Sequence, residues 1–294
     1  MRIFVTGATG FIGRAFVRQA VAGGHAVGAL ARPGSAAALS AHPALTVTVG
    51  TLAMPPWKDL TRFAPDVCVH AAWITDAGVY RDSPENDRYV DESLAFATGL
   101  FERGVGHVVA LGTSAEYRPS AQPLDEARSP LGPRSPYGRA KHALRLALSE
   151  QARGAGARLA WARIFQPYGA GEPSARLCST VARRLAVGER VTLDTPGAVR
   201  DWIHVDDVAT ALLCLVEGRV DTVVNVGSGV GRTVEDVART IADLLGRRDL
   251  VVAGAEAADV FGPLVADPAR LRRLGWKPRV ELAVGLSTLI EGLR

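Results

Sequence analysis

A glycine-rich turn near the N-terminus constrains the fold more than any other feature of this sequence. Gly7, Gly10 and Gly13 stand between an apolar run at residues 3–5 and an apolar helical pattern that begins at residue 11. A chain in this position must turn sharply, approach a pyrophosphate closely and present helix N-terminal amides to it. A Cβ at these positions would obstruct one of those tasks. A structural glycine turn has the same spacing, so it is the location after a strand that predicts a dinucleotide site.

Apolar runs and turn signals then alternate along the chain in a repeated β-α-β pattern. We expect strands at residues 2–6, 26–31, 45–49, 66–70, 107–112 and 158–163. We expect helices at residues 11–22, 86–103 and 136–152. Strands that are apolar on both faces and separated by helices are typical of a parallel sheet covered on both sides. The sequence therefore predicts an α/β fold with a Rossmann-type doubly wound parallel sheet.

The pattern changes after residue 164. A turn-rich stretch at 166–173 precedes an arginine-containing helix near 174–187, and the chain then returns through residues 200–226. Two closing helices are expected near 233–246 and 281–292. We therefore predict a dinucleotide-binding domain made of residues 1–165 and 200–230. A smaller, discontinuous C-terminal substrate domain would take residues 166–199 and 231–294.

Composition excludes several other classes of protein. The three cysteines, Cys68, Cys178 and Cys214, are widely separated, and no two of the six histidines stand at helical ligand spacing. We therefore expect buried free thiols and no metal site. No apolar run approaches the roughly 20 residues of a membrane-spanning helix, and no secretion signal opens the chain. The expectation is a cytoplasmic protein without a membrane partner.

Charge gives only weak information about partners. The net charge is +4, but the arginines are spread along the chain instead of forming a block or an aromatic-interleaved stripe. Nucleic acid is therefore not an expected partner. An anionic small molecule fits the same mild basicity.

The end of the second expected strand indicates which nicotinamide cofactor fits. An acidic side chain at this point would accept hydrogen bonds from the adenosine ribose. Here Ala31 replaces the acid and Arg32 follows it, so a planar, permanently charged group can meet a 2′-phosphate. NADP(H) is therefore favoured, with NAD(H) the alternative.

A phenol and an ammonium stand one helical turn apart in the expected helix at 136–152. Tyr137 and Lys141 are i and i+4, which places them on one face, and the chain has only three lysines. An isolated tyrosine has a pKa of about 10, and a nearby ammonium lowers it by stabilising the phenolate. The pair is therefore a candidate for proton transfer, although a surface pair on a helix has the same spacing.

Two hydroxyl residues follow the expected strand at 107–112. Thr113 and Ser114 lie where the carboxyl edge of a parallel sheet collects active-site groups. A hydroxyl there can donate to a substrate carbonyl oxygen, with Thr113 the better candidate. Such residues are also common in ordinary turns.

Taken together, these motifs are similar to those of the extended short-chain dehydrogenase/reductases, and within them to the nucleotide-sugar epimerase, dehydratase and ketoreductase branch. The residues that carry the resemblance are 6–13, 112–117, 137–141, 163–169, 200–207, 225–229 and 274–278. They span nearly the whole chain in order. Residues 70–80, with Trp73, further resemble deoxysugar nucleotide 4-ketoreductases such as CDP-abequose synthases.

The resemblance implies a role for each matched residue. It implies a catalytic triad of Thr113, Tyr137 and Lys141, with Tyr137 as the proton donor or acceptor and Lys141 on the nicotinamide ribose. Cofactor-binding residues are then Gly7, Gly10, Phe11, Ile12, Gly13, Arg32, Ala71, Ala72, Tyr137 and Lys141. Substrate-binding residues are Trp73, Thr113, Ser114, Tyr137, Gln166 and Arg200.

Some of these roles have alternatives in the residues alone. Arg200, which the resemblance assigns to a substrate phosphate, could instead pair with Asp201 or Asp206. Trp73 could equally be a packing residue.

Departures from the family pattern narrow the activity. Ser114 and Ala115 replace the Asp-Glu pair of 4,6-dehydratases, and Ala31 stands where 4-epimerases usually have an acid. Gln166 replaces the usual Asn, and Tyr89 stands at another Asn position. We therefore expect an NADPH-dependent 4-ketoreductase acting on a nucleoside-diphosphate sugar. A 4-epimerase with bound NAD and a non-catalytic NADP(H)-binding regulator are the alternatives.

The expected helices at 86–103 and 136–152 are apolar on more than one face. The resemblance implies that they pair two subunits, so a homodimer is expected. Burial within one chain explains the same pattern almost as well.

Overall fold

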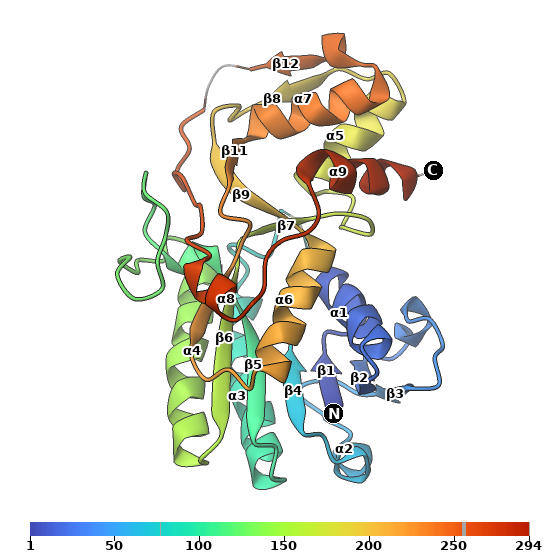
Figure 1. Ribbon diagram of the computed structural model, residues 1–294, viewed down its shortest axis with the longest axis vertical. Coiled ribbons are helices and arrows are strands. Elements are labelled where there is room, and N and C mark those ends of the chain that lie inside the picture. The colour runs from blue at the N-terminus through green and yellow to red at the C-terminus, as the bar shows by residue number, and fades with distance from the viewer. Residues whose placement is uncertain (77, 255–256, 294) are drawn as a thin grey trace. The chain divides into compact units, whose positions relative to one another are not determined.

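The computed structural model describes residues 1–76, 78–254 and 257–293, and Figure 1 follows the chain through them. The chain divides into two compact units. The first unit consists of residues 1–116, 132–163 and 209–224. The second unit consists of residues 117–131, 164–208 and 225–294. The boundary at 163/164 is close to the one expected at 165. Residues 117–131, 200–208 and 225–230, which were expected in the dinucleotide-binding domain, belong to the second unit.

The first unit contains the sheet. In the described residues it has seven strands in the order β10-β6-β5-β4-β1-β2-β3. Their bounds are β1 Arg2–Thr6, β2 Ala26–Ala31, β3 Leu45–Val49, β4 Val67–His70, β5 His107–Thr113, β6 Arg158–Ile164 and β10 Val223–Val226. The pairings that join β3, β2, β1, β4 and β5 are all parallel. Every residue of β4 and β5 is buried, as the apolar runs predicted.

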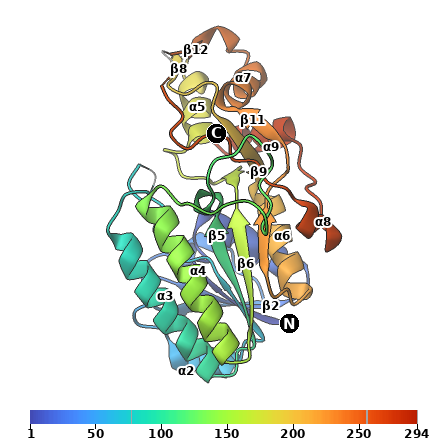
Figure 2. The same ribbon diagram turned by 90° about the vertical axis from the view of Figure 1, so that its left-hand side faces the viewer.

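Helices cover both faces of this sheet. They are α1 Phe11–Ala22, α2 Trp57–Phe63, α3 Glu85–Glu102, α4 Pro136–Gly154 and α6 Val205–Glu217. Figure 2 shows α3 and α4 side by side on one face, and α1 and α6 lie on the other face in Figure 1. Phe96 and Leu100 of α3 and Leu144 and Leu148 of α4 are spaced by four residues, which gives each helix an apolar stripe that faces the sheet core. The predicted Rossmann-type doubly wound sheet is confirmed.

The second unit has two small sheets and its own core. Its strands are β7 Gln166–Tyr168, β8 Val191–Leu193, β9 Val199–His204, β11 Gly231–Thr233 and β12 Val251–Ala253. Its helices are α5 Leu177–Ala186, α7 Val234–Leu245, α8 Ala269–Arg273 and α9 Leu282–Glu291. The strand orders are β11-β9-β7 and β12-β8. Buried aliphatic side chains of α5, α7 and α9 form one cluster, so this unit has an apolar core distinct from that of the sheet.

Three short 3₁₀ segments complete the described elements: η1 Ala36–Ala38, η2 Ser114–Glu116 and η3 Arg248–Leu250. Sequence reasoning missed α2 and α6. The helix α2 has only seven residues and no side-chain cap, and α6 is apolar around most of its circumference, so neither shows a clear helical period.

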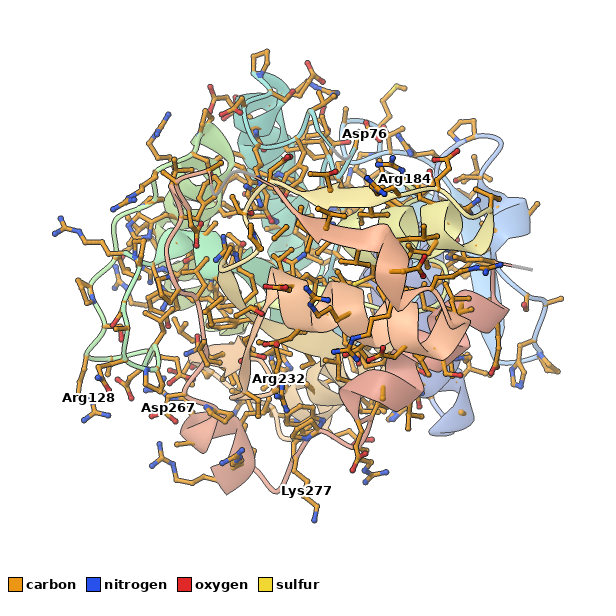
Figure 3. The ribbon with its side chains drawn as sticks, turned by 90° about the horizontal axis from the view of Figure 1, so that it is seen from above. Asp76, Arg128, Arg184, Arg232, Asp267 and Lys277 are labelled. Carbon is orange, nitrogen blue, oxygen red and sulfur yellow. The ribbon has the colours of Figure 1, made fainter. Side chains whose placement is uncertain are left out.

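Several charged side chains of the second unit come from different elements. Figure 3 labels Arg128, Arg184, Arg232 and Lys277, which come from the 117–131 segment, α5, β11 and the segment after α8. Arg184 is also paired with Glu189.

Two kinds of feature are missing from the residues that the structure describes. None of their helices is both long and apolar enough to cross a bilayer. No three of their His, Cys, Asp or Glu side chains come together as a metal site requires. Cys68 and Cys178 are buried free thiols, as expected, while Cys214 is partly exposed.

Candidate active site

The glycine turn between β1 and α1 has the backbone geometry that the sequence predicted. Gly7 has a φ of 65°, and a Cβ built on it would lie 2.6 Å from backbone atoms of Ala71 and Ala72. A Cβ on Gly13 would lie 2.0 Å from the Gly7 carbonyl oxygen. Real Cβ atoms do not approach backbone so closely, so both positions require glycine. The turn is thereby brought against the end of β4, where the predicted cofactor residues Ala71 and Ala72 follow.

The start of α1 fits an anionic group. Gly10 is the N-cap residue and supplies no side-chain cap, and the first turn contains no acidic residue. Phe11 and Ile12, the first residues of the helix, are partly exposed. The first-turn amides and the positive end of the helix dipole can therefore bind a diphosphate. A dinucleotide cofactor would place its diphosphate at this position.

Arg32 lies at the carboxyl end of β2, next to β1. It is exposed, and no described residue forms a salt bridge with it. Its carbonyl oxygen accepts a hydrogen bond from the Ser35 hydroxyl at 2.9 Å, which fixes the backbone of the turn but leaves the guanidinium to solvent. The Arg32 side chain is therefore exposed directly after the strand end that the sequence singled out for cofactor choice.

Thr113 is the last residue of β5, and Ser114 begins η2. Thr113 is buried, its hydroxyl accepts a hydrogen bond from the Ala115 amide at 3.2 Å, and its own amide donates to a Glu116 carboxylate oxygen at 3.0 Å. The hydroxyl retains its proton as a donor, because it accepts in the bond to Ala115. The strand end thus carries a held hydroxyl group, as the sequence predicted for this edge of the sheet.

Tyr137 and Lys141 lie one turn apart at the start of α4. Ser135 caps this helix by accepting from the Gly138 amide at 3.1 Å, and Pro136 occupies the first position. The Lys141 Nζ donates to the Leu111 carbonyl oxygen at 2.9 Å, two residues before Thr113 on β5. The structure therefore brings Lys141 to the strand that ends in the predicted hydroxyl.

Burial dominates the electrostatics of Lys141. The residue is 3% exposed, and desolvation lowers the pKa of its ammonium to about 7, while the charge of Glu116 acts in the opposite direction. Burial likewise lowers the pKa of nearby His70 to about 3, so that imidazole is neutral at physiological pH. Lys141 is thus a group that changes charge near neutrality, which is typical of functional lysines.

Trp73 covers the Lys141 ammonium. The Lys141 Nζ lies 3.7 Å from the Trp73 ring centroid, in a cation–π arrangement, and the edge of the same ring meets Tyr137 at 6.4 Å between centroids. The Trp73 indole nitrogen donates to the Asn86 side-chain oxygen at 2.9 Å. Sequence reasoning proposed Trp73 for the substrate; in the structure its ring packs against Lys141, Tyr137 and Tyr89.

Sequence reasoning missed the residues that hold this arrangement. Asn86 donates to the carbonyl oxygens of Tyr80 and Ser83, and the ring of Tyr80 meets Tyr137 edge-on at 4.9 Å. The Tyr137 amide donates to the Arg81 carbonyl oxygen at 3.0 Å. The contacts to Tyr137 join residues more than 50 positions apart, so no local spacing in the sequence signals them.

The other predicted substrate residues, Gln166 and Arg200, belong to the second unit. Gln166 is the first residue of β7 and lies opposite Trp202 of β9, and its side chain is partly exposed. Arg200 lies on β9 and donates to both carboxylate oxygens of Asp259, at 2.7 and 2.9 Å.

Arg200 does not pair with either of the two aspartates that the sequence suggested. The sequence suggested Asp201 or Asp206; instead Arg200 pairs with Asp259, 59 residues away, and also donates to the Gly262 carbonyl oxygen. Asp201 points to other groups and accepts from Ser228 and Gly229. Neighbouring strand residues face opposite sides, which explains why Asp201 does not reach Arg200. Arg200 lowers the pKa of Asp259 below its usual value.

A known protein family matches most of this chain. The family model described as "NAD dependent epimerase/dehydratase family" matches residues 3–227. The chain belongs to this family. The match begins in β1 and includes the glycine turn, Thr113, Tyr137 and Lys141.

Individual relatives have different activities. The dTDP-glucose 4,6-dehydratase of Streptomyces antibioticus is 27% identical, covering 100% of this chain and 92% of that protein. The dTDP-6-deoxy-L-talose 4-dehydrogenase (NAD(+)) of Aggregatibacter actinomycetemcomitans is 33% identical over 50% of this chain and about half (54%) of its own length. The crystal structure of Thermus thermophilus UDP-glucose 4-epimerase complexed with NAD has a TM-score of 0.88 at 25% identity, covering 99% of this chain and 98% of that one. These similar proteins thus differ in the reactions that their names describe.

Proposed function

We propose that this protein reduces a 4-keto (deoxy)sugar attached to a nucleoside diphosphate, using NADPH. The observation that carries the proposal is that the Lys141 Nζ donates to the Leu111 carbonyl oxygen, two residues before Thr113 at the end of β5, while Tyr137 lies one turn earlier on α4. Thr113, Tyr137 and Lys141 supply a hydroxyl that can donate to the ketone oxygen, a phenolic proton that can be transferred, and a cation. Reduction of a ketone requires all three.

The cofactor would be held by the glycine turn, the first-turn amides of α1 and Arg32. When bound, it supplies a hydride to the ketone carbon. The ketone oxygen meanwhile receives the phenolic proton of Tyr137 and accepts a hydrogen bond from the Thr113 hydroxyl. The Lys141 ammonium stabilises the resulting phenolate, and Trp73 and Leu111 hold that ammonium in place. The products are the secondary alcohol and the oxidised cofactor.

The preference for NADPH rests on Ala31 and Arg32. The buried Ala31 ends β2 without an acid, and the exposed guanidinium of Arg32 follows it. The structural relative from Thermus thermophilus is a complex with NAD. NAD(H) is therefore the alternative cofactor, and a direct comparison of the two affinities decides between them.

Two other reactions of the family compete with reduction. Ser114 and Ala115 follow Thr113, so the acid pair that drives 4,6-elimination is missing, which argues against a dehydratase. The likeness to the UDP-glucose 4-epimerase over nearly the whole chain supports 4-epimerisation as the second candidate. The partial likeness to a 6-deoxy-sugar nucleotide 4-dehydrogenase, whose reverse reaction is a 4-keto reduction, supports the proposed ketoreductase.

On this proposal Arg200 clasps the diphosphate of the substrate. Its two terminal nitrogens are bonded to Asp259, so binding requires an exchange of carboxylate for phosphate, or the sharing of the remaining donor. We also propose a homodimer formed through α3 and α4, as the family resemblance implies.

The experiment is incubation with NADPH and a panel of 4-keto-6-deoxy nucleotide sugars, followed by mass spectrometry. Reduction adds two mass units to the sugar and consumes NADPH stoichiometrically, whereas epimerisation consumes none. Tyr137→Phe keeps the ring but removes the proton, so turnover is expected to fall by about 100-fold or more with NADPH binding retained. Unchanged turnover in this variant would remove Tyr137 from the mechanism.

A further inference from the structure

The carboxylate of Glu116 lies directly beneath the turn that carries Thr113. Glu116 ends η2 and has no exposed surface. A carboxylate is not removed from water without hydrogen-bond donors to compensate for its lost hydration. The donors to this carboxylate therefore lie next to the catalytic candidates.

Three donors converge on this carboxylate. One oxygen, Oε1, accepts from the Thr113 amide at 3.0 Å and from the Trp161 indole nitrogen at 2.9 Å. The other, Oε2, accepts from Arg163 Nε at 3.0 Å, in an ion pair whose two side chains are at most 2% exposed. Glu116 therefore links the end of β5 to β6 through the residue that carries the catalytic hydroxyl.

The backbone of β5 is shaped around this group. A Cβ on Gly112 would lie 2.2 Å from the Trp161 indole nitrogen and 2.7 Å from Glu116 Oε1. Glycine at 112 thus allows the carboxylate and the indole to pack directly on the strand. The peptide that joins Gly112 to Thr113 is held on one side by the Glu116 side chain.

The same segment faces the helix that carries Lys141. A Cβ on Gly138 would lie 2.6 Å from the Ala115 carbonyl oxygen, so the first turn of α4 lies directly against η2. Lys141 follows on the next turn. The negative charge of Glu116 raises the pKa of Lys141, against the larger lowering caused by burial.

Other ionisable groups around Lys141 do not replace this charge. His70, from β4, is neutral above pH about 3. Tyr137, from the same helix as Lys141, is an anion only after it loses the proton it is assigned to transfer. Arg163, from β6, is cationic and bonded to Glu116. Glu116 is therefore the anion of this cluster.

We propose that Glu116 is a positioning residue: its carboxylate holds the Thr113 turn through the Thr113 amide and supplies the negative charge of the buried cluster into which Lys141 is packed. This role rests on the proposed reductase function. Glu116 touches neither the substrate nor the cofactor in this scheme, and it acts through Thr113 and Lys141.

The test begins with a measurement that needs no substrate. The chain has three lysines, so ¹⁵N-lysine labelling gives three Nζ resonances, of which Lys58 and Lys141 are assigned by their Met variants. In Glu116→Gln the amide oxygen can still accept from Thr113, but the charge is gone. We expect the titration midpoint of Lys141 to fall by on the order of one pH unit.

The matched control is Trp161→Phe, which removes one donor to the same carboxylate but leaves its charge. We expect the Lys141 midpoint to stay at its native value in this variant. A midpoint that is unchanged in Glu116→Gln, or that moves equally in both variants, would overturn the charge role.

A second variant separates charge from position and also covers the case in which Glu116→Gln does not fold. Glu116→Asp keeps the charge but withdraws the oxygen from the Thr113 amide by one methylene. The Lys141 midpoint should be retained, while the amide resonance of Thr113 shifts and kcat falls by about tenfold with little change in KM. A native Thr113 resonance and a native kcat in Glu116→Asp would overturn the positioning role.

Measurements of activity distinguish the role proposed for Glu116 from the proposed reductase function. If the native enzyme reduces a 4-keto sugar, the alkaline limb of its rate should move to lower pH in Glu116→Gln. A limb displaced by about one pH unit lowers the rate above it by about tenfold. If no substrate of the panel is reduced, the reductase proposal fails, and the lysine titration still decides whether Glu116 holds the charge of Lys141.

Discussion

The buried Lys141 side chain should make the free energy of unfolding depend on pH. Folding moves its pKa from 10.5 to about 7, because the ammonium is buried. Between these two pH values the unfolded chain binds a proton that the folded chain does not. In this range the free energy of unfolding therefore rises with pH by about 1.36 kcal/mol per pH unit. Below pH 7 the contribution of Lys141 is constant, because Lys141 is protonated in both the folded and the unfolded chain.

The perturbation is Lys141→Met, which keeps the apolar stem and removes the titrating group. Relative to this variant, the native protein should become more stable by about 2.7 kcal/mol between pH 7.5 and 9.5, the product of two pH units and the slope above. Below pH 7 the difference between the two should be flat. The variant should have no reductase activity at any pH, so stability and function respond to the same substitution in different ways.

The assay is urea unfolding followed by tryptophan fluorescence at pH 6, 7.5, 8.5 and 9.5. Lys58→Met is the matched control, since Lys58 is an exposed lysine on α2. The native protein and this control should show the same dependence on pH. A difference between native protein and Lys141→Met that stays constant from pH 7.5 to 9.5 would refute the assignment of a buried ammonium at this position.

Three further predictions concern the proposed ligands. Arg32→Ala should remove most of a preference for NADPH over NADH, since one charge-assisted contact contributes about 1.5 to 3 kcal/mol; titration of both cofactors measures it, and equal affinities in the native protein would contradict the proposal. Arg200→Ala should raise KM for the nucleotide sugar about tenfold or more with little effect on NADPH affinity, and an unchanged KM would place the diphosphate elsewhere. In the native enzyme kcat/KM should decline as the pH rises through about 7, because Lys141 loses its charge there; a profile flat from pH 6 to 9 would count against that role.

The sequence allowed much of the first unit to be predicted. Strands such as β1 and β2 are bounded by glycine or charged residues and buried along nearly their whole length, and their limits were expected as the structure has them. The glycine turn and the Tyr137–Lys141 spacing were also visible, because each depends on residues at most six positions apart. Local periodicity and local geometry are encoded in neighbouring residues, so they can be inferred from the chain alone.

The supports of the candidate site were not predictable in this way. Glu116 reaches Trp161 across 45 positions and Arg163 across 47, and Arg200 reaches Asp259 across 59. A glutamate in a turn has the same appearance in a sequence whether it is solvated or buried. Only the pairing of β5 with β6 shows that Glu116 lies inside, and sheet order is a property of the whole chain.

The three glycines of the first turn should differ in how well each position tolerates substitution. Replacement of Gly7 or Gly13 brings a methyl group against backbone, which no change of neighbouring side chain can relieve. A Cβ on Gly10 comes no closer than 3.2 Å to the Gly7 carbonyl oxygen, a contact that a small shift relieves. Selection for folding alone should therefore retain glycine at 7 and 13 but admit alanine at 10, and only selection for growth that depends on the cofactor should restore glycine at 10.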